Sequence, residues 1–337
     1  MNRCKLQLNC ALTNYQLDLQ SFMQVHHHID QLPVFHKAVI TIGTFDGVHS
    51  GHRQVINLLQ SEAARIGGET VVVTFHPHPR MVIAEERSSI HLLNTLEEKI
   101  SLLAAHGIGH LVVVPFNTAF AQQSAAAYIE DFLVEKFHPH TIIIGYDHRF
   151  GKGRQGDYHL LEAKAAQFNY AVKEIPGQLL QNIAISSTRI REALLKADVD
   201  NANALLGYPY FFSGTVVEGN KLGRTLGYPT ANLQPLEPDK LIPGNGVYAV
   251  TVVRSVKPGE ILKGMMNIGT RPTVGGSKRV IEVNIFDFDQ TIYSEVLSIA
   301  VHKRLRSEVK FSGLEALKAQ LAADKQDAED CLDRDQG

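Results

Sequence analysis

The sequence predicts an α/β domain built on a parallel sheet, followed by a small antiparallel β-barrel with a terminal helix. Three observations support this fold class. The length of 337 residues suggests two domains, at about 150 residues each. From about residue 38, short runs rich in valine and isoleucine alternate with helical patterns. After about residue 205, that alternation gives way to strand-like runs broken by glycine, proline and asparagine turns.

The N-terminal alternation begins with the strand AVITI, the helix GHRQVINLLQSEAARIG and the strand TVVVTF. The helix LNTLEEKISLLAAHG follows, which Asn94 or Thr95 opens and Gly107 closes. Further strands are HLVVVPF, TIIIGY and YAVKEIP, and further helices are AAAYIEDFLVEKF, DYHLLEAKAAQF and STRIREALLKAD. Strands that are apolar on both faces and separated by helices imply a parallel sheet, which binds ligands beyond the carboxyl ends of its strands. GTFDGVHSGH, HPHP and GYDHRFGKG each follow a strand.

The C-terminal part is predicted to be a barrel because it consists of many short strands at regular spacing. Its strand-like segments are YFFSGTVVEGN, GYPTANL, GVYAVTVVRS, LKGMMNIG, RVIEVNIFDF and SEVLSIAVHKRLR. A helical pattern returns only in SGLEALKAQLAADKQDAEDCL, which we expect to pack on the barrel.

Composition excludes several classes of protein. Hydrophobic residues make up 44% and charged residues 20%, as in ordinary globular proteins. A net charge of -2 gives no basic field for nucleic acid. The three cysteines (Cys4, Cys10 and Cys331) lack zinc-like spacing, so we expect a reducing, cytoplasmic setting. No apolar run approaches the roughly 18 residues that span a bilayer, so no membrane partner is expected.

The segment GTFDGVHSGH, residues 43–52, allows three interpretations: a glycine turn with surface histidines, a metal site, or a cradle for phosphate. His49 and His52 lie three residues apart where a helix starts, so they share a face. Gly43, Gly47 and Gly51 let the backbone approach a ligand, and free N–H groups at a helix start favour an anion. Zinc needs a third ligand, and none lies at a convincing spacing nearby.

A second segment, ISSTRIREAL at residues 185–194, is expected to open a helix with Ser186, Ser187 and Thr188. Arg189 then falls in the first turn, where a basic residue opposes the helix dipole. That placement suggests a negative ligand between Arg189 and the N–H groups. The alternative is simple capping by serine or threonine.

Two other segments imitate nucleotide-binding motifs. GKGRQG, residues 151–156, fits G-x-G-x-x-G but lies past the end of its strand and outside the first βα turn. GNKLGRT, residues 219–225, approaches a Walker A loop, but its glycines are one residue too close and no helical pattern follows. Neither is taken as the nucleotide-binding motif that it imitates.

The order GxFDGxHxGH … ISSTxIR resembles the nucleotidylyltransferase superfamily. The form FDGVHSGH, with TFHPHP after it, is similar to bacterial bifunctional riboflavin kinase/FAD synthetases. GRTLGYPTANL, GVYAV, NIGTRPTVGG and IEVNIFDFD resemble the riboflavin kinase barrel of that family, and LRSEVKFSGLEALKAQLAADKQDAEDCL resembles its terminal segment. The resemblance covers about residues 23–334 and implies a Rossmann-like nucleotidylyltransferase sheet joined to a riboflavin kinase barrel.

The resemblance also implies the domain limits. We expect an FMN adenylyltransferase domain over residues 23–204 and a kinase barrel with C-terminal helix over 205–337. The family usually begins near Met23, so residues 1–22 are interpreted as a weakly structured extension, which an upstream start codon explains.

In the first domain, the resemblance implies that FMN phosphate attacks the α-phosphorus of ATP and that pyrophosphate leaves. His49 and His52 hold the ATP phosphates, together with Ser186, Ser187 and Arg189. The remaining residues expected at this site are Gly43, Phe45, Asp46, Gly47, Thr188 and Asp147. Asp147 and Arg149 match a family loop near the flavin and nucleotide. The family carries phenylalanine where Tyr146 and His148 stand, and a plain turn role for Asp147 is the alternative.

In the barrel, the resemblance assigns Mg²⁺ coordination to Thr230 and support of the metal or phosphates to Asn232, with Gly223 and Arg271 in the binding site. Glu282 is the expected general base for the 5′-hydroxyl of riboflavin. Strand alternation puts Glu282 and Asn284 on the face opposite to Ile281 and Val283. The family often has histidine where Asn284 stands.

The predicted function is therefore ATP-dependent conversion of riboflavin to FMN and of FMN to FAD, with Mg²⁺ as cofactor and ATP, riboflavin and FMN as substrates. One alternative is the same superfamily acting on another phosphorylated cofactor precursor, against which the kinase-like barrel argues. The other is a flavin-binding sensor with inactive sites, against which the intact motif residues argue.

Overall fold

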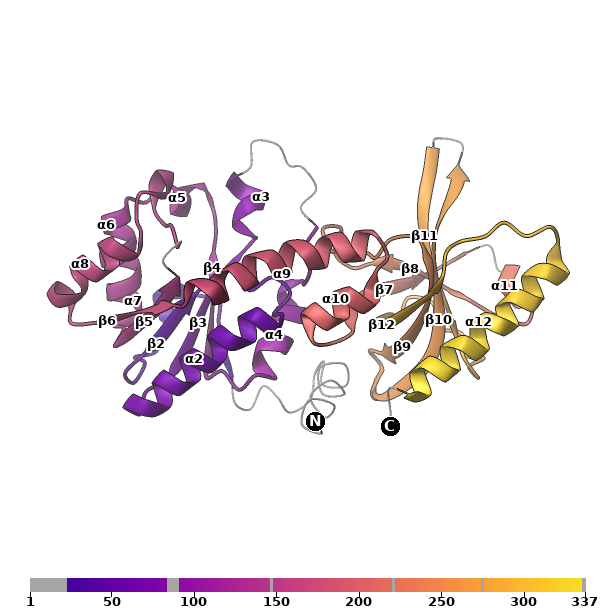
Figure 1. Cartoon of the computed structure of the whole chain (residues 1–337), viewed down its shortest axis with the longest axis horizontal. Coiled ribbons are helices and arrows are strands. Elements are labelled where there is room, and N and C mark those ends of the chain that lie inside the picture. Colours follow the sequence, from indigo (N-terminus) through magenta and orange to yellow (C-terminus); the bar gives the residue numbers. More distant parts are fainter. Residues whose placement is uncertain (1–22, 84–90, 146–147, 220–221, 274–275, 335–337) are drawn as a thin grey trace. The chain divides into compact units, whose positions relative to one another are not determined.

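Figure 1 shows the computed structural model of the chain, which describes residues 23–83, 91–145, 148–219, 222–273 and 276–334. The chain divides into two compact units, with the division between Ser187 and Thr188. The predictions for residues 1–22 and for Asp147 lie outside the described residues. Among the described helices, none is long and apolar enough to cross a membrane.

The first unit contains a parallel sheet in the order β1-β4-β3-β2-β5-β6. Its strands are β1 (Gln24–His26), β2 (Val39–Ile42), β3 (Thr70–His76), β4 (His110–Pro115), β5 (Thr141–Gly145) and β6 (Ala171–Ile175). After β2 the chain builds the sheet outward through β3 and β4, then crosses to the other side of β2 for β5 and β6. The strand order therefore reverses between β2 and β5. In sheets of this kind, ligands bind beyond the carboxyl ends of the strands at such a point.

The helices that follow these strands are mostly those that the sequence predicts. They are α2 (Ser50–Ile66), α3 (Pro79–Ile83), α4 (Leu96–Ala104), α5 (Thr118–Ala121), α6 (Ala125–Ala127), the π-helical segment Tyr128–Val134, α7 (Glu135–Phe137), α8 (Tyr158–Phe168), α9 (Gly177–Leu195) and α10 (Val199–Leu206). One face of the sheet, with Ile40, Val73 and Ile142, packs on Phe132 and Phe137 to form a buried core. The prediction missed β1, α3, α5 and α10.

The second unit is a closed antiparallel barrel in the order β10-β11-β8-β7-β12-β9, so the predicted fold class is confirmed. Its elements are β7 (Tyr210–Val217), α11 (Leu222–Thr225), β8 (Ala231–Pro235), β9 (Gly246–Arg254), β10 (Lys257–Thr273), β11 (Gly276–Ile285), β12 (Val296–Arg306) and α12 (Leu314–Arg334). Ile281, Val283 and Ile285 lie in the barrel core, as strand alternation predicts. Helix α12 packs on the outside, where Ala328 and Leu332 contact Met265 and its neighbours.

Helix α4 begins with a capping box. The Thr95 hydroxyl accepts a hydrogen bond from Glu98 N at 3.2 Å, and the Glu98 carboxylate accepts one from Thr95 N at 2.9 Å. Of the two N-caps that the sequence offers, Thr95 is therefore the one used. The reciprocal bonds fix where α4 starts and how its first turn faces the sheet.

We expect Thr95→Ala to lower the free energy of unfolding of the first unit by about 1 kcal/mol, because an N-cap bond is lost. Thr95→Ser is the matched control and should retain the stability of the parent. Amide hydrogen exchange along α4 measures the effect, and equal exchange in Thr95→Ala and parent would contradict it.

Candidate active sites

The loop from Gly43 to His49 connects β2 to α2 at the point where the strand order reverses. Gly43 N donates to Val73 O at 3.0 Å, so the loop starts in register with β3. Phe45 has φ of 48°, Gly47 of 90° and Val48 of 35°. A positive φ is costly for valine and phenylalanine, which persist there only when the surroundings hold them. The loop is therefore a strained, fixed turn at the expected binding edge of the sheet.

The two histidines of this loop lie side by side. His49 is fully buried and His52 is 8% exposed, and their rings stack with centroids 3.8 Å apart. His49 Nδ1 accepts a hydrogen bond from His52 N at 3.4 Å, so His49 caps α2. A nitrogen that accepts carries no proton, so the ring proton of His49 lies on Nε2. Nε2 lies 2.8 Å from the Ser187 hydroxyl, to which it then donates.

His52 is held in its neutral form. Burial is the main cause that lowers its pKa well below the usual 6.5, and nearby His49 and Lys99 lower the pKa further. Its Nδ1 atom is buried and has no hydrogen-bond partner within the described part of the chain. A buried polar atom without a partner is unusual and points to a ligand that is absent here.

Asp46 is buried and anchors the loop rather than facing solvent. One carboxylate oxygen accepts hydrogen bonds from Leu93 N at 2.9 Å and Asn94 N at 3.2 Å. These two N–H groups lie just before α4. Asp46 thus ties the loop of residues 43–49 to the start of α4.

The expectation that Ser186, Ser187 and Thr188 open a helix is wrong. Helix α9 begins at Gly177, after Pro176, so these residues lie nine or more positions inside it. The argument from the helix dipole at Arg189 is therefore wrong as well, since that dipole acts only within the first turn. Pro176 is the start signal, and residues 178–185, between Gly177 and the serines, contain no glycine or proline to break the helix.

One residue of the segment ISSTRIREAL nevertheless contacts the segment GTFDGVHSGH, since Ser187 forms a hydrogen bond with His49. Thr188 and Arg189 are exposed on α9, and the side chain of Ser186 lies outside what the structure describes. Beyond β5, Arg149 pairs with Asp157 at 2.5 Å, which ties this loop to the start of α8.

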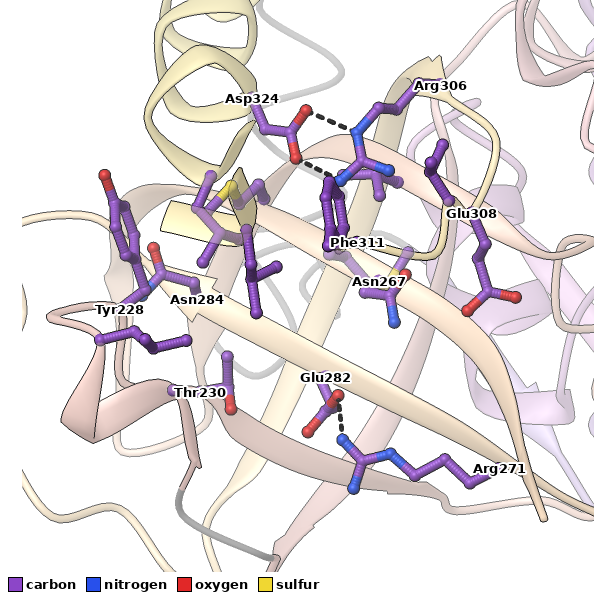
Figure 2. A pocket seen from close by; sticks show the side chains of 18 residues that line it. Tyr228, Thr230, Asn267, Arg271, Glu282, Asn284, Arg306, Glu308, Phe311 and Asp324 are labelled. Carbon is purple, nitrogen blue, oxygen red and sulfur yellow. Dashed lines mark hydrogen bonds and ion pairs between the residues drawn. The ribbon is translucent and has the colours of Figure 1, made fainter. Parts of the chain in front are cut away.

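In the barrel, the expected kinase residues line a cavity of about 240 Å³ on the outer face of β10 and β11 (Figure 2). Gly223, Thr230, Arg271, Glu282 and Asn284 all contribute to its wall. Glu282 and Asn284 therefore face the cavity while their neighbours in β11 face the core. Strand alternation predicts this arrangement.

Glu282 is partly buried and forms an ion pair with Arg271, whose Nη2 lies 2.7 Å from Glu282 Oε2. Figure 2 shows the two side chains pointing toward one another at the lower side of the cavity. Asn284 donates to Pro229 O at 2.7 Å and so holds the segment that carries Thr230. Within the described residues, the contact with Arg271 uses one carboxylate oxygen of Glu282, and no second hydrogen bond occupies the other.

Asn232 lies opposite Glu282 in the β8–β11 register but does not line the cavity. Two glycines lie so close to the PTAN segment, residues 229–232, or to the residue before it that a side chain at either position would clash. A Cβ at Gly219 would lie 2.0 Å from the Asn232 amide nitrogen, and one at Gly223 would lie 2.3 Å from Tyr228 O. Within the described residues, no group of three His, Cys, Asp or Glu side chains forms a metal site.

Sequence reasoning missed the opposite wall of this cavity, which comes from the end of β12, the segment after it and α12. Arg306 and the buried Asp324 form a bidentate pair with both distances 2.7 Å. Glu308, Phe311 and Leu321 complete this wall. A separation of 18 residues between Arg306 and Asp324 gives no local pattern, so only the fold brings them together.

A parallel sheet with a histidine-bearing loop at its switch point, together with a barrel that has a carboxylate-lined cavity, is typical of a two-unit transferase. Residues 32–189 match the FAD synthetase family, and residues 206–332 match the riboflavin kinase family. The bifunctional riboflavin kinase/FMN adenylyltransferases of Haemophilus influenzae and Listeria monocytogenes are 38% and 40% identical to this chain. The alignments cover 88% and 90% of this chain and 94% and 95% of the relatives.

A solved structure titled as a macrolide-efflux protein from Streptococcus pneumoniae is 29% identical, with a TM-score of 0.79. It covers 91% of this chain, and the match includes 99% of that structure. The chain belongs to the family of bifunctional riboflavin kinase/FMN adenylyltransferases. The predicted family, its two enzymatic activities and the fold class are thereby confirmed.

We expect His52→Ala to lower the rate of FAD formation from FMN about 10²-fold, on the scale of one lost donor to developing charge. Riboflavin phosphorylation, measured in the same preparation, should stay at the parent rate because the barrel has its own core. Equal loss of both activities would contradict separate sites.

Proposed function

We propose that the loop of residues 43–52 and Ser187 form the ATP phosphate site of the adenylyltransferase. The observation that carries this assignment is the contact between His49 Nε2 and Ser187 Oγ, which joins segments 138 residues apart. Both lie at the edge of the sheet where the strand order reverses, and the His52 Nδ1 atom has no partner there within the described residues. Gly43, Phe45, Asp46 and Gly47 shape the loop.

In this site an FMN phosphate oxygen attacks the α-phosphorus of ATP, and the bond to the pyrophosphate group breaks. No covalent enzyme intermediate is needed, so the protein acts by holding the reactants in line and stabilising charge. Neutral His52 contributes a ring N–H rather than a full charge. Thr188, Arg189, Ser186 and Asp147 remain assigned to nucleotide or flavin by resemblance alone.

In the barrel, we propose Glu282 as the general base. Its carboxylate accepts the proton of the riboflavin 5′-hydroxyl as that oxygen attacks the γ-phosphorus of ATP, and ADP leaves. The position of Glu282 in the cavity wall supports this role. Arg271 orients the carboxylate through one oxygen, which leaves the other for the substrate.

Magnesium is the cation that fits the donors near this cavity. The Thr230 hydroxyl and the Asn232 amide are neutral oxygen donors, and Mg²⁺ takes few protein ligands because phosphates and water supply the rest. Gly223 leaves room beside Thr230, since its absent Cβ would lie 3.4 Å from the Thr230 hydroxyl. When bound, the cation neutralises charge on the phosphates of ATP.

The domain limits 23–204 and 205–337 are part of this proposal, as is the role of residues 1–22 as an extension. So are a cytoplasmic location and a set of partners limited to ATP, riboflavin and FMN. The absence of a basic field supports the exclusion of nucleic acid.

We expect Glu282→Gln to lower FMN formation by 10²-fold or more, on the usual scale for loss of a general base. Added FMN should still become FAD at the parent rate. Chromatography of the flavins separates the two steps. Glu260→Gln, which changes an exposed carboxylate of β10, is the matched control and should resemble the parent. FMN formation at the parent rate in Glu282→Gln would exclude Glu282 as the general base.

Removal of divalent cations by excess EDTA should stop riboflavin phosphorylation, and added Mg²⁺ should restore it. Thr230→Val should raise the Mg²⁺ concentration needed for half-maximal rate about 10-fold, because about 1.4 kcal/mol of metal binding corresponds to that factor. Thr230→Ser keeps the oxygen and should resemble the parent. An unchanged Mg²⁺ dependence in Thr230→Val would refute the role of Thr230.

A further inference from the structure

Lys99 on α4 is a buried lysine that none of the motifs includes. Its side chain is 6% exposed, whereas lysines are almost never fully buried without a partner. Its ammonium group lies 3.4 Å from the Thr74 hydroxyl on β3, and that hydroxyl lies 3.3 Å from the carbonyl oxygen of Thr44. An ammonium group only donates, so the direction is fixed: Lys99 donates to Thr74, and Thr74 donates to the loop of residues 43–49.

The charge of Lys99 is balanced by the same loop. Burial lowers the pKa of Lys99 to about 8, and the opposing effect, which raises it, comes from the carboxylate of Asp46. Asp46 in turn accepts the N–H groups of Leu93 and Asn94 immediately before α4. The loop of residues 43–49 is therefore held at two points. Asp46 binds the N–H groups just before α4, and Lys99 of α4 reaches the loop through Thr74.

Lys99 also acts on the expected phosphate ligands. Its positive charge is one of the causes that lower the pKa of His52, after burial and His49. The titratable groups that face it are Asp46 from the loop and His52 from α2. Glu98, adjacent on α4, directs a carboxylate oxygen to Thr95 N, and Thr74 of β3 carries no charge.

We propose that Lys99 is a positioning residue for adenylyl transfer, whose buried ammonium group fixes the loop of residues 43–49 and balances Asp46 beside the ATP phosphates. The inference rests on the proposed phosphate site and extends it by one residue. Two non-glycine residues of this loop have positive φ, so the loop needs such external support. Without the cation, the Asp46 carboxylate would lose the positive charge that balances it close to the phosphates.

This role predicts a particular pH dependence. Since the pKa of Lys99 in the folded protein lies near 8 rather than 10.5, the cation is present below that pH and is lost above it. FAD formation should therefore have an alkaline limb with an apparent pKa near 8 in kcat/KM, which reports the free enzyme. In kcat the limb should lie at higher pH, because bound phosphates favour the protonated lysine.

The experiment measures kcat and KM for ATP in FAD formation from pH 6.5 to 9.5, in full-length protein. Lys99→Met should lower kcat/KM about 10-fold or more at pH 7 and should lack the limb near pH 8. Lys99→Arg keeps the charge and should retain activity at pH values where the parent has lost it. Lys136→Met, which removes an ion-paired lysine on α7, is the matched control and should resemble the parent.

Thr74→Val tests the same path while it leaves the lysine in place. It should lower FAD formation at pH 7 and retain the alkaline limb, which separates positioning from loss of folding. Parent-like rates and an unchanged limb in Lys99→Met would overturn the proposal if His52→Ala still lowers FAD formation. Parent-like rates in His52→Ala would instead show that the proposed phosphate site itself is wrong.

Discussion

The position of β2 between β3 and β5 is the constraint on which the first active site depends. Because β2 pairs in parallel with both β3 and β5, the loop of residues 43–49 lies at the carboxyl edge of the sheet, at the point where the strand order reverses. The strained turn and the start of α2 follow directly in the chain, and Ser187 of α9 reaches the same place from 138 residues away. If β2 were at the sheet edge, the same seven residues would be a surface turn.

In the barrel, the cavity depends on side-chain alternation along one strand rather than on strand order. Alternation along β11 sends one set of side chains into the core and the other to the outer face, so one strand both stabilises the unit and supplies Glu282. Helix α12 then covers that face, and the pair between Arg306 and Asp324 links it to β12. Breaking a largely buried pair by removing one partner is costly, which makes this pair a fixed wall of the cavity.

The sequence predicted what depends on local pattern. Valine-rich strands, the capped start of α4 and the alternation in β11 each follow from rules that act over a few residues, and all are present in the structure. Strand β1 was missed because Gln24–His26 is short and polar and joins the sheet through backbone pairing with β4. Lys99 was missed because EEK reads as a solvated helix face, and burial of its third residue is set only by tertiary packing.

We expect the two activities to be separable because each unit has its own buried core. The first core contains residues of the parallel sheet and of the segment Tyr128–Phe137, and the second contains residues of the barrel strands together with Val199 of α10. Substitutions at distant residues that share no contact partner have nearly additive effects on the free energy of unfolding. Loss of one activity in a variant therefore reports on one site, whereas in a single-core enzyme the same loss would be hard to distinguish from general destabilisation.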